Sequence, residues 1–391
     1  MARALSLLGD AVVPVGLAFA VLEINQSASA VGGVLAARTA SLVAFLLVGG
    51  VLADRLPRKF VLIASDVVRF VAHGLMAVLI LTQQAELWHL MVLSFLFGIG
   101  WAFFLPTSTG FVPDTVSNDK LQQANALIAA TFSGAQILGP VIAGVLVVAV
   151  GPGWVLGLDA LTFLVSAGFV ARVRVTGDIN RRVSSLLEDF REGWREFTSR
   201  TWLWVDGVYS ALTAFVVFPA FFTLGPIISE RALGGARAWA TIVTAFGIGS
   251  VVGGIVLFRF RPRRPLLVGI PPLILLAVPL ALLATSRETT FIAVGALGGG
   301  FGLTIFNTLF ETTVQEHVPA KALSRVASID WMLSQGLQPL GYAIVGPIAA
   351  ASGFRSPLLG ASVWVLVTTI LVLSIPSVRT VERKGMNSDV M

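Results

Sequence analysis

The run GVLADRLPRK, from Gly50 to Lys59, places a group of charged side chains directly after about twenty apolar residues. Asp54 falls at the C-terminal end of the expected helix. The negative end of the helix dipole disfavours a carboxylate there unless a cation or another helix N-terminus lies opposite. The nearest cations are Arg55, Arg58 and Lys59. The run therefore predicts either an electrostatic latch between helices or a basic loop in which Pro57 ends the preceding helix.

Asp10 lies early in the first apolar stretch, between Gly9 and Pro14. An ionisable group inside a bilayer is costly, so each one is a functional hypothesis whose partner has to be found. A carboxylate buried at Asp10 could hold a proton and release it against a cationic substrate, because bending near Gly9 and Pro14 could open the helix towards a cavity. The alternative is an Asp that is solvated or locally paired near the inner membrane surface.

Other ionisable residues also interrupt apolar stretches. Asp66 and Arg69 can pair on one helix face, either as a structural ion pair or as a proton-coupling element, and His73 one turn on could be polar packing or a relay. Arg38 either snorkels towards the outer surface or contacts an anionic substrate. Four further carboxylates lie within or beside apolar stretches: Asp159, Asp206, Glu311 and Asp330. Of these, Asp206 and Glu311 are additional candidates for contact with substrate or proton.

The composition places the chain in a membrane. Hydrophobic residues make up 56% of the 391 residues and charged residues 12%, about half the charged share of an ordinary soluble domain. The net charge of +6 does not predict a nucleic-acid partner, because the basic residues fall in short runs between apolar stretches. With no Cys and three His, disulfides and thiol catalysis are excluded, and we expect neither a metal site nor a cofactor.

A helix that crosses the hydrocarbon core needs about 20 mostly apolar residues. Cutting the chain at charged or Gly/Pro-rich breaks yields twelve expected spans. They cover residues 3–24, 31–53, 60–82, 88–110, 123–150, 154–173, 202–225, 237–259, 265–286, 290–313, 325–351 and 355–375. Most Lys and Arg residues fall on one side of these spans, and the positive-inside rule then places both termini in the cytoplasm.

Residues 174–200 form the longest polar stretch and are expected to link two six-helix bundles, residues 1–173 and 201–376, with a cytoplasmic tail at 377–391. Apolar side chains recur in the linker at helical spacing: Val183, Leu186, Leu187, Phe190, Trp194 and Phe197. This pattern predicts an amphipathic helix, which either lies on the inner membrane surface or packs beneath the bundle.

The two halves repeat each other. Span five and span eleven share a pattern in which Gly134, Gln136, Leu138, Gly139, Ile142 and Gly144 correspond to Gly336, Gln338, Leu340, Gly341, Ile344 and Gly346. The Gly50–Lys59 run has an imperfect copy after span eight, with Phe258 in the place of Asp54. Two six-span repeats joined by a long loop favour a transporter whose halves move around a central cavity.

With twelve spans, a repeat and this loop, the chain resembles the major facilitator superfamily. The family's loop pattern is G-x-x-x-D-R-x-x-R-[RK], and Gly50, Asp54, Arg55, Arg58 and Lys59 fill its defined positions. The resemblance implies an all-α membrane fold of twelve helices in two pseudo-symmetric six-helix bundles. It also implies that the loop closes the inner gate against span eleven, whose N-terminus near 322–325 would face Asp54.

A second motif resembles the glycine-rich element G-x-x-x-G-P-x-x-G-G that the family's antiporters carry in span five. Gly139, Pro140 and Gly144 match it, whereas Ala135 and Ala143 replace two of its glycines. Small residues and a proline are compatible with a hinge, with a leak-preventing seal or with simple helix packing.

Several phrases, including SLLGDAVVP and EDFREGWREF, are similar to the branch of macrolide-efflux proteins, enterobactin exporters and lysophospholipid transporters. The resemblance implies export of an amphiphilic small molecule from a bacterial-type inner membrane, by alternating access and proton antiport. The expected partners are that substrate, protons and membrane lipid, with the protein a monomer. The alternatives are a lysophospholipid flippase or siderophore exporter and, from another class, a membrane-embedded enzyme.

Overall fold

The structure is a computed structural model that describes residues 2–116, 120–173, 186–319 and 322–383. Within these ranges the regular structure is helical throughout, and eleven helical segments are long and apolar enough to cross a membrane. Their lengths follow from the apolar runs in the sequence, because a helix satisfies every backbone hydrogen bond internally where no water can do so. The chain is a multi-pass membrane protein.

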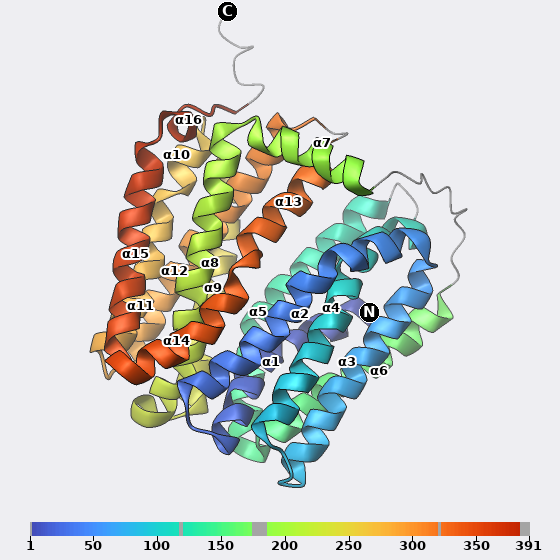
Figure 1. The fold of residues 1–391 in the computed structure, drawn as a ribbon, viewed down its shortest axis with the longest axis vertical. Helices are drawn as coiled ribbons and strands as arrows, with labels where there is room; N and C mark the ends of the chain where they lie inside the picture. The colour runs from blue at the N-terminus through green and yellow to red at the C-terminus, as the bar shows by residue number, and fades with distance from the viewer. Residues whose placement is uncertain (1, 117–119, 174–185, 320–321, 384–391) are drawn as a thin grey trace, which may run out of the picture. The chain divides into compact units, whose positions relative to one another are not determined.

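The first six spans are long helices that pack side by side (Figure 1). Helices α2 and α4 pack together, α3 packs on both α4 and α6, and α1 packs on both α5 and α6. Their bounds are α1 Ala2–Ile24, α2 Ala28–Arg55, α3 Arg58–Leu81, α4 Leu87–Thr115, α5 Leu121–Val150 and α6 Pro152–Arg172.

The later spans are less regular. The predicted end of span seven at residue 225 is too early, because α8 continues past Pro226 and is prolonged by the π-helix η2. A proline is tolerated within a membrane helix when neighbouring groups satisfy the freed backbone. The bounds are α8 Thr201–Ile228, η2 Ser229–Leu233, α9 Ala236–Arg259, α10 Pro265–Gly269, η3 Pro271–Leu276, α11 Ala277–Thr285, α12 Thr289–His317, α13 Leu323–Gly336, α14 Gln338–Ser352, α15 Arg355–Ser374 and α16 Pro376–Arg379.

Prolines divide two of the expected spans. Span nine consists of α10, η3 and α11, since Pro271 and Pro272 remove backbone donors from its middle. Span eleven is divided at Leu337 into α13 and α14, with Pro339 in the first turn of α14. Neither piece is long enough alone to count as a span, which is why eleven segments meet the criterion where twelve were expected.

The chain separates into two compact units. The first contains residues 1–183 together with 226–244 and 342–347, and the second contains residues 184–225, 245–341 and 348–391. The first unit thus adds two later segments to the expected first bundle. In the second unit, α12 packs on η3, α10 and α11, and α15 packs on α11.

The short helix α7, Leu186–Thr198, forms within the predicted linker and packs on α13. Phe197 is buried, and Glu192 pairs with Arg325 of α13 at 2.7 Å between Oε2 and Nη1. Phe190 and Trp194 stack on each other and are each 42% exposed. One face of α7 therefore packs on α13. The exposed pair Phe190 and Trp194 lies on the rest of its surface and is free to contact the membrane. Val183 lies outside the described residues, as do the side chains of Leu186 and Leu187.

Candidate functional site

Six ionisable side chains form one buried cluster inside the first unit, contributed by four helices. They are Asp10 of α1, Arg38 of α2, Asp66, Arg69 and His73 of α3, and Asp159 of α6. Aromatic side chains of α4 and α6 surround them. We call these six residues the charge cluster.

Helix α3 supplies the centre of the charge cluster. Asp66, Arg69 and His73 are spaced by three and four residues, so they share one helix face. Arg69 is fully buried; its Nη2 donates to Asp66 Oδ1, and its Nη1 lies 3.7 Å from Asp10 Oδ2. The pairing expected from the sequence is present, and Arg69 additionally links α3 to α1. Gly100 of α4 makes room for it, since a Cβ there would lie 2.9 Å from Arg69 Cγ.

His73 and Asp159 form the second pair of the charge cluster. Nδ1 of His73 lies 2.5 Å from Oδ2 of Asp159, and both side chains are almost completely buried. The other ring nitrogen, Nε2, has no partner among the described residues. Gly9 accommodates Asp159, because a side chain there would collide with its carboxylate. A proton between these two groups is held in a place closed to water.

Aromatic rings take the place of water around the cations. His73 stacks on Phe97 with 4.0 Å between ring centres and 7° between planes, and the guanidinium carbon of Arg38 lies 4.1 Å from the centre of Phe97. At such separations the two groups must occupy opposite faces of the ring. The guanidinium carbon of Arg69 lies 3.9 Å from the centre of the Phe104 ring and 4.3 Å from that of Phe163. Cation–π contacts of this kind stabilise a desolvated cation by about 2 kcal/mol each.

The charges of the cluster do not balance without a proton. Three carboxylates face two guanidinium groups, so one negative charge remains when His73 is neutral. An unbalanced charge is costly in a buried site. One proton, on His73 or on a carboxylate, makes the cluster neutral.

Asp10 is the most accessible member of the charge cluster. Its side chain is 19% exposed, whereas Asp66, Arg69, His73 and Asp159 are each at most 1% exposed. Its Oδ1 has no partner among the described residues. Helix α5 lies directly behind it, since a Cβ on Gly139 would lie 2.5 Å from Cβ of Ala11. Exchange with the surroundings can therefore begin at Asp10.

The remaining predicted residues lie elsewhere. Lys59 Nζ donates to the carbonyl oxygen of Val173 at 2.9 Å, so it caps the C-terminal end of α6. Arg58 begins α3, and the side chains of Gly50, Asp54 and Arg55 lie outside the described ones. The latch thus remains a prediction. Pro140 lies inside an unbroken α5, and Gly144 lies against Ala240 of the same unit.

Asp206 and Glu311 belong to the second unit and take no part in the charge cluster. Asp159 does, although the sequence marked it only as a carboxylate within a span. Its partner His73 lies 86 residues away, and no local spacing could indicate that contact.

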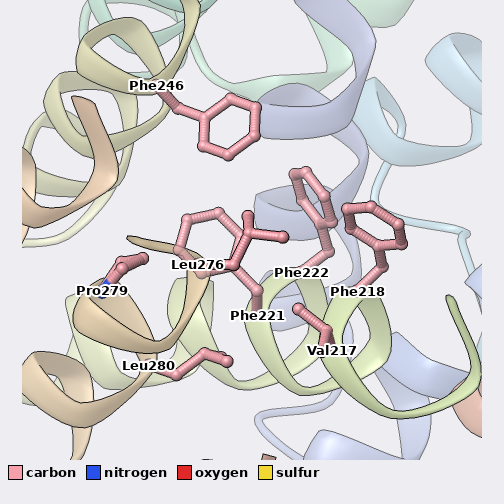
Figure 2. A pocket seen from close by; sticks show the side chains of 8 residues that line it. All are labelled: Val217, Phe218, Phe221, Phe222, Phe246, Leu276, Pro279 and Leu280. Carbon is pink, nitrogen blue, oxygen red and sulfur yellow. The ribbon is translucent and has the colours of Figure 1, made fainter. Parts of the chain in front are cut away.

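The second unit contains a small apolar pocket between α8, α9, η3 and α11 (Figure 2). It is lined by Val217, Phe218, Phe221, Phe222, Phe246, Leu276, Pro279 and Leu280. Its free volume is about 10 Å³, and a cavity of that size without polar groups stays dry. Side chains would have to move before a drug-sized molecule could enter.

Known proteins resemble the whole chain. Multidrug efflux pump Tap of Mycolicibacterium fortuitum is 26% identical, over 96% of this chain and 94% of that protein. Macrolide efflux protein A of Streptococcus pyogenes is 23% identical, over 95% and 92%.

Solved transporter structures share the fold at low sequence identity. The nucleoside transporter NupG has a TM-score of 0.71 and 14% identity, covering 95% of this chain and 97% of its own. A mutant of the peptide transporter POT has a TM-score of 0.79 and 10% identity, covering 98% and 94%. The family model described as Major Facilitator Superfamily matches residues 1–342. The chain therefore belongs to the Major Facilitator Superfamily.

Proposed function

We propose that the protein is a secondary active exporter in a bacterial plasma membrane. It moves an amphiphilic small molecule outward by alternating access, against an inward flow of protons. Family membership and the two efflux pumps among its relatives support export. The family and both of these relatives are transporters, so they give no support to a membrane-embedded enzyme.

The observation that carries proton coupling is the charge cluster, which is one proton short of neutrality. A proton at Asp10, Asp159 or His73 supplies the missing charge. A cationic group of the substrate beside Asp10 would supply it equally well, because Asp10 is the partly exposed carboxylate. Either cation then neutralises the cluster, and binding of one disfavours the other. This competition is the thermodynamic requirement for antiport.

Arg69 connects the two ends of this exchange. When Asp10 takes up a proton, its attraction for Arg69 is lost and Arg69 is left to Asp66. When Asp10 is ionised, Arg69 is shared between the two carboxylates. The charge state of α1 is thereby transmitted to α3 and, through His73, to α6. Helices that respond to protonation in this way can bias the equilibrium between inward- and outward-facing states.

A substrate with a cationic centre suits a site with a negative excess. A lysophospholipid or a siderophore would instead rely on Arg38, whose guanidinium is already stacked on Phe97 and lies 5.3 Å from the centre of the Trp101 ring. We therefore favour the cationic amphiphile. The protein would work as a monomer surrounded by lipid, with both termini in the cytoplasm and the Gly50–Lys59 loop closing the inner gate.

The test uses proteoliposomes with an imposed pH gradient and a cationic amphiphilic dye. Asp159→Asn leaves two carboxylates opposite two guanidinium groups, so the cluster is neutral without a proton. We expect this variant to lose gradient-driven transport and to bind the dye more weakly than the wild type, because the negative excess that favours a cation is gone. Glu288→Gln, a neutralisation of an exposed carboxylate at the start of α12, is the matched control and should behave as the wild type. Full gradient-driven transport by Asp159→Asn would refute the proposal.

A further inference from the structure

A stripe of polar side chains runs along one face of α8 inside the second unit. Asp206, Tyr209, Ser210 and Thr213 are spaced by three, four and seven residues from the first, which places them on one side of the helix. Ser210 Oγ lies 3.5 Å from Asp206 Oδ2, and Tyr209 Oη lies 3.0 Å from Thr369 Oγ1 of α15. The stripe therefore faces the interior of this unit rather than lipid.

Asp206 is the ionisable member of this stripe and is only 4% exposed. Its Oδ1 is buried and has no hydrogen-bond partner among the described residues. The charged group that acts on it is Asp330 of α13, whose own Oδ1 also lacks a partner in the described part of the chain. Two carboxylates that influence each other in a buried place do not both remain ionised.

Among the described residues, no cation compensates this pair. Among the charged groups on the elements around α8, Arg325 pairs with Glu192, Arg383 pairs with Glu316, and Nδ1 of His317 lies 3.0 Å from the carbonyl oxygen of Thr313. The remaining described ones on these elements are Arg191, Arg195, Glu196, Arg237, Arg259, Glu311 and Arg355. Of all these groups only Glu311 acts on Asp330, and it is also an acid. In the charge cluster of the first unit, two arginines nearly balance three carboxylates, whereas no arginine balances Asp206 and Asp330 among the described residues.

The three carboxylates differ in exposure in a regular order. Glu311 of α12 is exposed, Asp330 is half-buried and Asp206 is buried. Each acts electrostatically on the next. A cation at Asp206 would satisfy the carboxylate oxygen that lacks a partner among the described residues. A proton is the cation that needs no additional space and that satisfies an unpaired carboxylate oxygen directly, by converting it to a hydroxyl donor.

We propose that Asp206 and Asp330 form a second proton-binding site, located in the second unit. Proton binding there follows from burial and the missing cation alone. Its contribution to transport rests on the proposed proton antiport, and it raises the number of protons exchanged for each substrate by one.

The binding itself is tested on the purified full-length protein by infrared difference spectroscopy between acidic and alkaline pH. The stretch of a protonated carboxyl group reports each bound proton, and its shift in D₂O confirms the assignment. We expect Asp206→Asn to remove one carboxyl band and Asp330→Asn to lower the pH at which that band is lost, whereas Asp10→Asn and Glu288→Gln leave it in place. Asn has nearly the shape of Asp and removes a buried charge, so the variants should fold, as size-exclusion chromatography will show. An unchanged set of bands in both variants would overturn the proposal.

A second measurement separates this site from the proposed function. The reversal potential in proteoliposomes gives the number of protons per substrate, and Asp206→Asn should lower it by one. If Asp159→Asn keeps gradient-driven transport while Asp206→Asn loses its band, the proposed mechanism of the first unit falls and the second site stands. If sodium ions remove the band at constant pH in the wild type and in Asp10→Asn, which keeps the band, the site takes sodium in place of a proton and the assignment of a proton as its transported cation is wrong.

Discussion

Replacing Arg69 with methionine should strongly destabilise the first unit, because this side chain neutralises two carboxylates at once. The Arg69–Asp10 separation of 3.7 Å corresponds to about 4 kcal/mol of attraction at an effective dielectric constant of about 20. Breaking a buried ion pair from one side costs about 3–5 kcal/mol. Methionine retains favourable contacts with the rings of Phe104 and Phe163, so part of the packing survives. We expect a loss of about 3–5 kcal/mol in the free energy of unfolding.

The double variant Arg69→Met/Asp66→Asn separates charge from packing. It removes the deeply buried carboxylate together with its cation. Of the carboxylates that remain, Asp10 is partly exposed and Asp159 keeps its contact with His73. The loss should then fall to about half that of the single variant, a coupling well within the range found for contacting residues. Denaturant unfolding in detergent, followed by circular dichroism, measures both. A single variant that loses less than about 1 kcal/mol, or a double variant that loses as much as the sum of the two single changes, would refute this electrostatic account.

Three further changes test the packing. Gly98→Val would press α4 against the backbone of α2 and should lower the unfolding free energy by about 1–3 kcal/mol. Gly168→Ala, with open space around its Cβ, is the control and should not lower it. Equal effects of the two changes would contradict the close approach of α4 to α2. Lys59→Met should lower thermal stability by the equivalent of about 1 kcal/mol, because the end of α6 loses its cap; an unchanged melting temperature would argue against that role. Gly193→Val should speed hydrogen–deuterium exchange in α7, since its Cβ would lie 2.9 Å from Cβ of Arg325, and unchanged exchange would show that α7 is held otherwise.

Hydropathy predicted the spans because a segment that crosses lipid forms a helix, which pairs its own backbone groups, and presents apolar side chains to the lipid. Such a helix appears in the sequence as a long apolar run. It predicted the ends poorly where proline is involved. Pro226 does not end α8, whereas Pro339 accompanies the division of span eleven. Whether a proline ends, bends or divides a membrane helix depends on what the neighbouring helices offer to the freed carbonyl groups. That information lies in the tertiary structure and not in the local sequence.

The same distinction applies to the charge cluster. The Asp66–Arg69 pair could be predicted because its spacing fits one helix face. The His73–Asp159 pair could not, since it joins α3 to α6 across the unit. The stacking of Arg38 on Phe97 was also missed, although both residue types were visible, because neither alternative for Arg38, snorkelling or contact with an anionic substrate, included an aromatic neighbour.

The charge cluster is an unfavourable way to build a stable bundle. Apolar residues of similar volume would serve a membrane interior at least as well, and replacing buried ion pairs in this manner is often neutral or stabilising. Six ionisable side chains on four helices are therefore explained better by exchange of charge than by stability. In the proposed antiport the exchange begins at Asp10, the most exposed member of the charge cluster, and has to act on members that are buried. A proton arriving at Asp10 changes the field at Arg69 directly, and Arg69 in turn lies on the same helix face as His73. Protonation at one carboxylate can thus alter the preferred packing of α1, α3 and α6 without any ion crossing the centre of the cluster.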